Sequence, residues 1–460
     1  MQYISTRGAA PELNFEEAML AGLARDGGLY VPKALPKFDS KFISSLGHLS
    51  YEEIAFKVMK PFVGEVFEEV EFKNIIHQSY SNFIHHSKAP LRQLSEKHYL
   101  LELYHGPTLA FKDFAMQLIG QLFRASLKKT GKRVTIIGAT SGDTGSAAIE
   151  AFKGLEAVDV FILYPRGRVS EVQRRQMSTP SSTNVHAISI DGDFDDCQKA
   201  LKDLFNDLKF RDQVNLSGVN SINWARIMAQ IVYYFSSYSS LNLDGKKVRF
   251  TVPTGNFGDI FAGYIAKKIG LPISKLIIAT NQNDILHNAL TSGEYARGIV
   301  NPSMSPSMDI QVSSNFERAI YYALSCDSSK VSQLFADFAH TGSFKIQEST
   351  LINLLAHYSS GKVSEDETSE TINNALKKYK VEVCPHTAVG LKVAEDNMCD
   401  EPMITLATAH PAKFFEAYES STGKRPVMPK NLSNLFNKKE RITELPNSLD
   451  AIKSVVLERI

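Results

Sequence analysis

The chain has 460 residues, which is enough for two or three domains with sizeable hydrophobic cores. Its 51 Lys and Arg residues balance 50 Asp and Glu residues, so no overall field favours nucleic acid or a membrane surface as a partner. The four cysteines are scattered without a CxxC pair, so we expect neither disulfides nor a metal site. The opening segment is acidic and lacks the apolar stretch of a signal peptide, and no run is long enough to span a bilayer, so we expect a soluble cytoplasmic protein.

Residues 1–95 are predicted to be mainly helical, with patterned segments at 51–63 and 70–84. From residue 96 onward, Val- and Ile-rich runs alternate with amphipathic helices, which is typical of mostly parallel α/β sheets. The polar stretch 359–370 is expected to be an exposed loop or linker. Strands are predicted at 99–103, 134–137, 158–163, 185–190, 248–252, 276–279 and 403–406. Helices are predicted at 112–128, 144–153, 193–207, 222–240, 259–269 and 410–420.

Lys112 is the most informative residue of the chain. It lies in the motif HGPTLAFKDFA at 105–115, where a loop containing Gly106 and Pro107 leads into an apolar-striped helix. An amine that is partly buried beside a helix N-terminus should have a lowered pKa. A Schiff-base nucleophile requires such an amine. An isolated lysine near a helix start is usually solvated, but two glycine-rich loops later in the chain favour a catalytic role here.

The first glycine-rich loop, GATSGDTGSA at 138–147, follows a predicted strand and opens a helix. Its small residues let backbone amides approach an anion, and Thr140, Ser141 and Thr144 add hydroxyl donors at the positive helix end. The loop matches neither a Walker motif nor GxGxxG. An anion site and an ordinary helix-capping turn both remain open at this point.

The second loop, PTGNFGD at 253–259, also joins a predicted strand to a helix. Its two glycines and Asn256 suit a phosphate, because they permit close backbone approach and positive φ angles. Asp259 would repel a phosphate, so we expect it to cap the helix that follows.

Thr408 stands at the carboxyl end of a predicted buried strand, where open α/β sheets place ligands. Thr408 could equally cap the next helix. His105 and His410 are acid–base candidates, although a lone histidine at such a position is more often a structural donor. The segment 384–388 could lie near a site, but no chemical step is assigned to it.

These motifs, in this order, resemble those of the threonine synthase family, most closely its longer type found in fungi and many bacteria. The segments NSINWAR at 220–226 and YISTRG at 3–8 match as well. The resemblance implies the architecture of fold-type-II pyridoxal-phosphate enzymes, with two mostly parallel α/β domains and an N-terminal, mainly helical domain. It implies a carbon–oxygen lyase of threonine biosynthesis that converts O-phospho-L-homoserine and water into L-threonine and phosphate.

The resemblance also implies a division into domains. Residues 1–95 would form the helical domain, and residues 130–245 the small α/β domain. The large cofactor-binding domain would combine 96–129 with 246–440, leaving 441–460 as a C-terminal tail.

Lys112 would bond covalently to pyridoxal 5'-phosphate and move the protons of the substrate. The cofactor would also contact Gly255, Asn256, Phe257, Gly258, Asp259 and Thr408. Thr408 would hydrogen-bond the nitrogen of the cofactor's pyridine ring. The substrate carboxylate would bind to Thr140, Ser141, Gly142, Asp143 and Thr144. Shorter, plant-type relatives carry Asn where Asp143 stands, and a carboxylate cannot donate to the cofactor's phenolate oxygen, so the role of Asp143 stays open.

The phosphate of the substrate requires a second anion site. A helix N-terminus with polar side chains and an arginine can form one, and the segment 220–226 has this pattern. We expect Ser221, Asn223 and Arg226 to form this site, with Arg168 closing over it.

Three alternatives remain open. The weakest is a non-catalytic interaction protein, since Lys112 and both glycine-rich loops would then be coincidences. A related pyridoxal enzyme could eliminate phosphate from phosphohomoserine and release a keto acid. An α/β protein could instead use both glycine-rich loops to bind a nucleotide, although the Walker and GxGxxG motifs are missing. The expected partner is a small molecule, O-phospho-L-homoserine, and the protein is expected to be a monomer or a small homo-oligomer.

Overall fold

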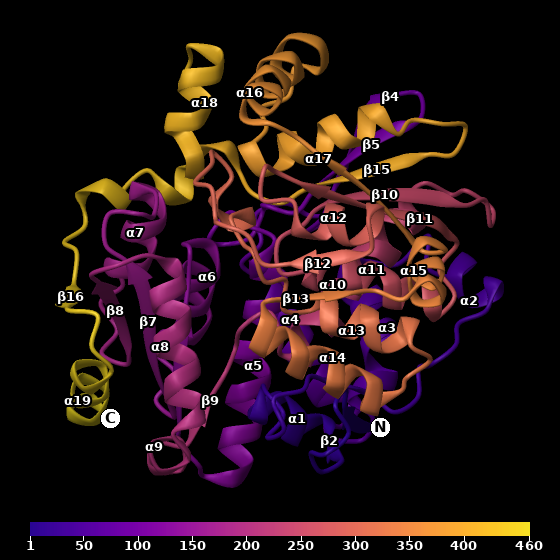
Figure 1. Cartoon of the computed structure of the whole chain (residues 1–460). Coiled ribbons are helices and arrows are strands. Elements are labelled where there is room, and N and C mark those ends of the chain that lie inside the picture. Colours follow the sequence, from indigo (N-terminus) through magenta and orange to yellow (C-terminus); the bar gives the residue numbers. More distant parts are fainter.

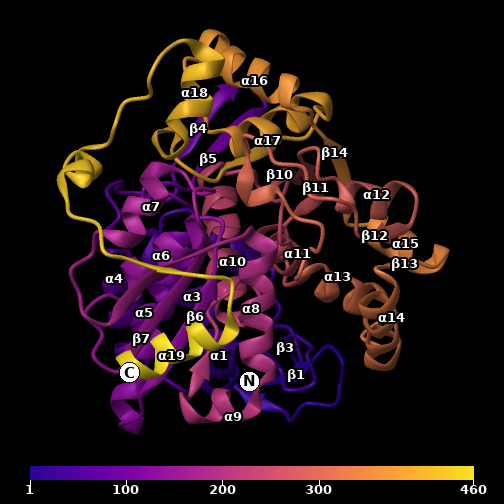
Figure 2. The same cartoon turned by 60° about the vertical axis from the view of Figure 1, so that its left-hand side comes forward.

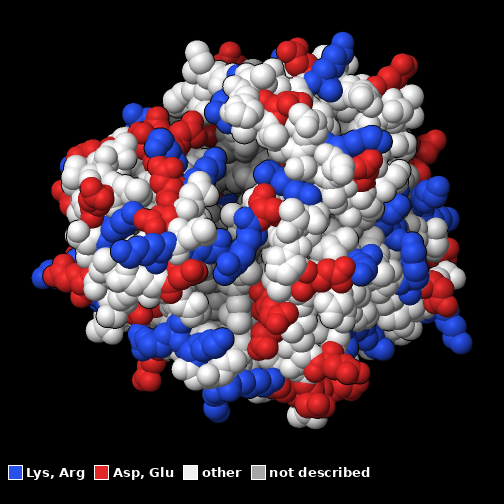
Figure 3. All heavy atoms as spheres, turned by 60° about the horizontal axis from the view of Figure 1, so that its bottom comes forward, with Lys and Arg blue, Asp and Glu red and all other residues white. Residues whose placement is uncertain are grey.

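The computed structural model describes the chain from Met1 to Ile460, apart from the side chain of Asn431. Two mostly parallel sheets with flanking helices lie side by side, and the N-terminal helices pack beneath the larger one (Figure 1). No helix among the described residues is long and apolar enough to cross a membrane. On the face shown in Figure 3, acidic and basic side chains are interspersed.

The large sheet has six strands in the order β14-β11-β10-β15-β5-β4. All neighbours are parallel except β4 and β5, which form an antiparallel pair. The strands are β4 (Leu91–Ser95), β5 (His98–Glu102), β10 (Val248–Pro253), β11 (Ile273–Thr280), β14 (Tyr358–Lys362) and β15 (Met403–Ala407). The central strand β15 is wholly buried, as expected for a parallel sheet covered on both faces.

The small sheet has five parallel strands in the order β16-β8-β7-β6-β9. They are β6 (Val134–Ala139), β7 (Val158–Pro165), β8 (Val185–Ile190), β9 (Leu216–Ser217) and β16 (Ile442–Leu445). Its helices are α6 (Asp143–Phe152), α7 (Glu171–Ser178), α8 (Phe194–Asn206), α9 (Leu208–Gln213) and α19 (Leu449–Arg459).

The residues expected to form a C-terminal tail belong instead to the small sheet. After α18 (Phe415–Thr422), the chain crosses from the top of the large sheet to the outer side of the small one (Figure 2). There β16 pairs with β8, and α19 buries Ile452 and Val456 in the core shared with α8. The last residues of the chain therefore complete a domain that begins more than 300 residues earlier.

The N-terminal region combines four helices with a small antiparallel sheet of order β2-β1-β3. The elements are β1 (Gln2–Ser5), β2 (Leu13–Asn14), α1 (Phe15–Ala21), β3 (Tyr30–Pro32), α2 (Ser40–Ser44), α3 (Tyr51–Val63) and α4 (Glu69–Tyr80). Helices α3 and α4 pack against α10 (Trp224–Ser240) and α5 (Lys112–Thr130), respectively. Because α10 also packs against α5 and α11 (Gly258–Lys268), it lies with the large sheet and not with the small domain to which 130–245 were assigned.

The segment after β11 contains elements that were not predicted. They are α12 (Ile285–Thr291), β12 (Glu294–Ala296), α13 (Phe316–Ala323), α14 (Ser328–Thr341), β13 (Ser343–Lys345) and α15 (Glu348–Leu355). The prediction of an exposed loop at 359–370 is wrong, because this stretch holds most of the edge strand β14 and the first half of α16 (Glu365–Asn374). Ser364 and Glu367 form a capping box that starts α16, so the polar residues there are helix-starting residues.

Candidate active site

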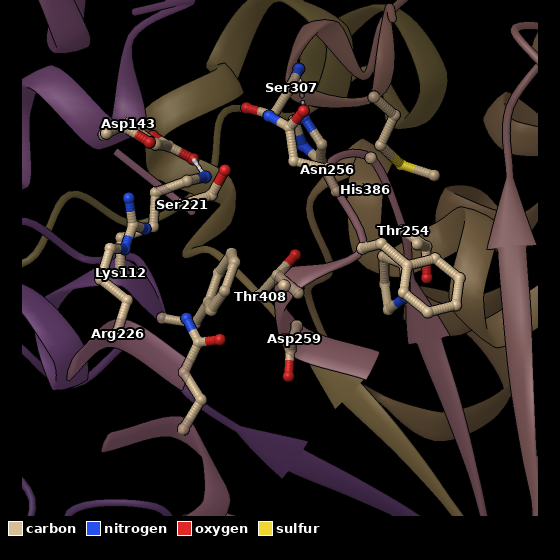
Figure 4. Close-up of a pocket in the computed structure, with 18 residues that line it drawn as sticks. Lys112, Asp143, Ser221, Arg226, Thr254, Asn256, Asp259, Ser307, His386 and Thr408 are labelled. Atoms are coloured by element: carbon tan, nitrogen blue, oxygen red, sulfur yellow. Dashed lines mark hydrogen bonds and ion pairs between the residues drawn. The ribbon is translucent and has the colours of Figure 1, made fainter. Parts of the chain in front are cut away.

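Loops at the carboxyl ends of β6, β10 and β15 meet at the first turn of α5 and enclose a cavity (Figure 4). We call it the Lys112 cavity. The predicted site residues that line it are Lys112, Asp143, Thr144, Ser221, Arg226, Gly255, Asn256, Phe257, Gly258, Asp259 and Thr408. Residues that were not assigned to the site also line it: Phe111, Gln230, Pro253, Thr254, Ser307, Met308 and His386.

Lys112 is the first residue of α5, and its side chain is only 12% exposed. Its Nζ lies 3.6 Å from Oδ2 of Asp143. Burial lowers the pKa of Lys112, and the positive charges of Arg226 and Lys413 lower it further, although Asp143 opposes them. The amine therefore has the reduced basicity that nucleophilic and proton-transfer chemistry requires.

Asp143, at the start of α6, is held by a second lysine. Lys413 Nζ lies 2.8 Å from Asp143 Oδ1 and donates to the carbonyl oxygen of Thr108 at the same distance. Gln173 Nε2 donates to the same carboxylate oxygen at 2.9 Å. Burial alone would raise the pKa of Asp143, but Lys413 and Lys112 outweigh it and hold this pKa far below its usual value. Asp143 is therefore a fixed negative charge that accepts hydrogen bonds and cannot donate them.

Close approach of the backbone was predicted for the loop between β10 and α11. Two separate features support it, a close contact at Gly255 and a positive φ angle at Phe257. A Cβ added to Gly255 would lie 2.7 Å from the carbonyl oxygen of Ser307, so no larger side chain fits there. Gly255 does not have a positive φ angle; Phe257 does, at 61°, and it precedes the first residue of α11. The loop and the first residues of α11 line the cavity, and the free backbone amides of a helix start suit an anion.

The expectation that Asp259 caps α11 is wrong, because the helix begins at Gly258 with Phe257 in the cap position. The Asp259 carboxylate instead accepts hydrogen bonds from the hydroxyls of Tyr233, at 2.5 Å, and Tyr234, at 3.0 Å. Burial raises the pKa of Asp259 to about 6, although both tyrosines act against the rise. Sequence alone could not pair Asp259 with residues of α10.

Thr408 follows β15 and is held through its backbone. Its N–H donates to the hydroxyl of Thr387 at 3.2 Å, and its carbonyl accepts from the N–H of Phe111 at 2.8 Å. The Thr408 hydroxyl makes no hydrogen bond to another described residue, and Thr408 lines the cavity (Figure 4).

Five predicted substrate residues do not line the Lys112 cavity. The Thr140 hydroxyl accepts from the backbone N–H groups of Gly142 and Gly145, each at 2.9 Å, so it shapes its own loop. A Cβ at Gly142 would collide with Gln173 at 2.2 Å, so this glycine serves close packing. Ser141 and the exposed Arg168 line a neighbouring cleft of about 950 Å³.

Asn223 also lies outside the cavity wall. It is fully buried, and its side-chain amide is used in the cap of α10: Oδ1 accepts from Ala225, while Nδ2 donates to the carbonyls of Met19 and Gly218. Arg226, one turn into the helix, is 2% exposed and lines the cavity. Its Nε has no partner among the described residues. Asn223 therefore orients the helix that presents Arg226.

Several buried polar atoms of the cavity lining lack a partner among the described residues. They are Arg226 Nε, Gln230 Oε1, Asp259 Oδ2, Ser307 Oγ and His386 Nδ1. Buried polar groups are rarely left unsatisfied in native proteins, so several at one cavity indicate a polar ligand. Among the described residues, no group of three or more His, Cys, Asp or Glu side chains could hold a metal ion.

Comparison with known proteins identifies the family. Residues 2–80 match the family described as threonine synthase N terminus, 84–402 the pyridoxal-phosphate dependent enzymes, and 387–456 the threonine synthase C-terminal family. Threonine synthase of Pseudomonas aeruginosa is 50% identical over 99% of this chain and 98% of its own length.

The chain belongs to the threonine synthase family. Solved structures agree: pyridoxal-phosphate-bound threonine synthase from Brucella melitensis is 50% identical, with a TM-score of 0.96 over 100% of this chain and 99% of that one. Threonine synthase from yeast is 40% identical, with a TM-score of 0.93 over 100% and 98%. The predicted family, fold class and cofactor are confirmed.

The residues of the Lys112 cavity fit pyridoxal phosphate. Lys112 provides a buried amine of lowered pKa. The N-terminus of α11 and the loop before it, where no Cβ fits at Gly255, provide a place for a phosphate. Thr408, directly after β15, adds a hydroxyl-bearing side chain to the cavity wall (Figure 4). These three features are what a phosphorylated pyridine aldehyde needs for covalent attachment, phosphate binding and ring orientation.

Proposed function

We propose that the Lys112 cavity binds pyridoxal phosphate and O-phospho-L-homoserine, and that it converts the latter with water into L-threonine and phosphate. The observation that carries this proposal is the buried amine of Lys112, whose pKa is lowered, in one cavity with the glycine-rich loop between β10 and α11. When bound, the cofactor supplies an electron sink for the negative charge that develops on the substrate.

Lys112 is the group that moves protons. Phosphate leaves from Cγ, so Cα and then Cβ must first lose a proton. After phosphate has left, a proton must be added at Cγ, which becomes the methyl group of threonine. Water then adds at Cβ, and a proton is returned to Cα. A single mobile amine of lowered pKa can perform these transfers on one face of the substrate. Asp143, at 3.6 Å, holds the amine in position without itself giving up a proton, because Lys413 keeps it ionised.

The remaining residues bind and orient. The backbone of Gly255–Gly258 holds the cofactor phosphate, and the hydroxyl of Thr408 hydrogen-bonds the ring nitrogen. The charge of Asp143 disfavours a carboxylate beside it, so the substrate carboxylate binds to Thr144 and to the amides at the start of α6.

The substrate phosphate binds to Ser221 and Arg226. Both line the cavity, and Arg226 keeps a free Nε–H donor there. Burial lowers the pKa of Arg226 only to about 10, so its charge persists at neutral pH. Arg168, on the adjoining cleft, would reach this phosphate only if the small domain moved towards the large one.

The test uses the purified protein loaded with pyridoxal phosphate. We expect the visible absorbance of a lysine-bound cofactor, borohydride fixation of the pyridoxyl group on Lys112, and equal amounts of phosphate and threonine from phosphohomoserine. Release of a keto acid instead would identify a phospho-lyase. A colourless protein that binds ATP would identify the nucleotide-binding alternative.

The protein would act in the cytoplasm on this small molecule as a monomer or small homo-oligomer, without nucleic acid or membrane partners. Light scattering of the loaded protein gives the mass in solution and tests the oligomeric state.

A further inference from the structure

His386 is a buried histidine of the Lys112 cavity to which the proposed reaction assigns no role. It is the second residue of α17 (Pro385–Asp396), is 4% exposed and lies in the cavity wall beside Ser307 (Figure 4). Its ring packs against Phe414, with the ring centroids 4.7 Å apart. The ring is therefore held in place from one side by an aromatic residue and from another by the loop that carries Ser307.

One hydrogen bond determines which ring nitrogen carries the proton. The backbone N–H of Ser307 lies 3.1 Å from Nε2 of His386. A backbone N–H can only donate, so Nε2 must accept with its lone pair. In the neutral imidazole the proton then lies on Nδ1, which becomes a donor.

This donor has no partner among the described residues, although the atom is buried. Leaving a buried N–H without an acceptor is costly, so we expect a bound ligand to supply the acceptor. The ring also stays neutral. Burial, together with the charges of Lys112 and Lys413, outweighs Asp143 and lowers the pKa of His386 to about 3, and the positive end of α17 acts in the same direction.

We propose that His386 donates a hydrogen bond from Nδ1 to an anionic oxygen of the ligand in the Lys112 cavity. Asp143 cannot do this, because Lys413 and Gln173 hold it as an acceptor. His386 supplies the neutral donor that a carboxylate at position 143 lacks. The oxygen belongs either to the cofactor or to the substrate carboxylate. This inference rests on the proposed function, since it needs that ligand in this cavity.

A matched pair of variants tests the donor. In His386→Asn the amide reaches the place of Nδ1 and can donate there, but the acceptor for Ser307 is lost. In His386→Gln the amide reaches the place of Nε2, so the acceptor for Ser307 is kept and the donor at the place of Nδ1 is lost. Each holoenzyme is compared with the parent in three measurements: cofactor affinity, the pH at which the visible absorbance of the cofactor changes, and KM and kcat for phosphohomoserine.

We expect the glutamine variant to be impaired about 10-fold or more and the asparagine variant to be impaired much less. If the cofactor supplies the oxygen, cofactor affinity and the spectral transition change without substrate. If the substrate supplies it, KM rises while both cofactor measurements match the parent. Equal loss in both variants, or a larger loss in the asparagine variant, would show that His386 only braces Ser307 and would overturn the proposal. The parent enzyme tests the proposed function separately, since it must bind cofactor and form threonine whatever the variants do.

Discussion

At the scale of single residues, the charge of the site depends on an ion pair that links distant parts of the chain. Lys413 follows β15 and Asp143 begins α6, yet their side chains meet in a place where the lysine is fully buried. Burying two charges is costly, and only mutual attraction and additional hydrogen bonds offset the cost. Thr108 and Gln173 provide those hydrogen bonds.

Lys413→Met should therefore destabilise the protein. Without Lys413, the buried Asp143 keeps only the more distant Lys112 as a counter-charge, and loss of one partner of a buried pair costs about 3–5 kcal/mol of unfolding free energy. Urea unfolding measures this cost. The double variant Lys413→Met/Asp143→Asn, which removes both charges of this pair, should recover much of it. A single variant as stable as the parent would contradict a tight ion pair.

The same pair predicts a difference in acid stability. The pKa of Asp143 in the folded protein lies far below its unfolded value of about 3.9. A depressed carboxyl pKa stabilises the fold fully above the unfolded pKa, and the contribution is lost as the pH falls from there towards the folded pKa. Below about pH 4, the parent should therefore lose stability more steeply than the neutral double variant. Parallel slopes in urea titrations at a series of pH values would exclude this contribution.

Arg226→Ala tests the proposed site for the substrate phosphate. Hydrogen bonds to charged groups contribute about 1.5–3 kcal/mol each, so kcat/KM for phosphohomoserine should fall about 10- to 150-fold. Cofactor affinity should stay at the parent value, because the cofactor phosphate binds at α11. Arg226→Lys should lie between the two. Loss of the cofactor from a folded Arg226→Ala protein would mean that Arg226 binds the cofactor phosphate and not the substrate phosphate.

At the scale of elements, the loop between β10 and α11 owes its shape to one close contact. Gly255→Ala would place a Cβ 2.7 Å from the backbone carbonyl of Ser307, and neither backbone can yield easily. Overpacking of this kind costs about 1–3 kcal/mol, so the Kd for pyridoxal phosphate should rise about 5- to 150-fold. Gly298→Ala, an exposed glycine facing only the end of a flexible glutamine, should leave the Kd unchanged. Absorbance titrations of both variants give the two constants.

The elements that could be predicted are those with strong local signals. The Val- and Ile-rich strands and the glycine loops stand out because parallel strands are buried on both faces. The edge strands β14 and β16 were missed because they are short and their side chains are largely polar or partly exposed. Helix α10 was located correctly, but its burial against α3 and α5 depends on contacts that only the tertiary structure creates.

In the candidate site, too, contacts between distant elements could not be predicted from the sequence. Lys112, the loop at 253–258 and Thr408 could be identified because each follows a strand or opens a helix. The partners of Asp143 and Asp259 could not, since they come from other elements. His386 lies in a segment noticed for its composition, but only the contact with Ser307 shows which nitrogen is a donor.

At the scale of the whole molecule, the chain returns at its end to the small domain. Ile452 on α19 is fully buried in the core that α8 and the small sheet share. Ile452→Ala should lower the unfolding free energy by about 2–5 kcal/mol, because it removes apolar contacts and leaves a cavity. Leu457→Ala, at a position 41% exposed on the same helix, should change it by less than about 0.5 kcal/mol. Urea unfolding of both variants compares the two positions, and similar losses would show that α19 is not anchored through Ile452.

The position of β15 has a consequence for how the protein is made. In the large sheet, β15 lies between β10 and β5, and in the small sheet β16 covers the edge of β8. The ribosome adds both strands late, so the emerging chain carries β5 and β10 without the strand that joins them. Unpaired strand edges are templates for association with other chains. A newly synthesised molecule therefore needs protection from aggregation until β15 and β16 have emerged and paired.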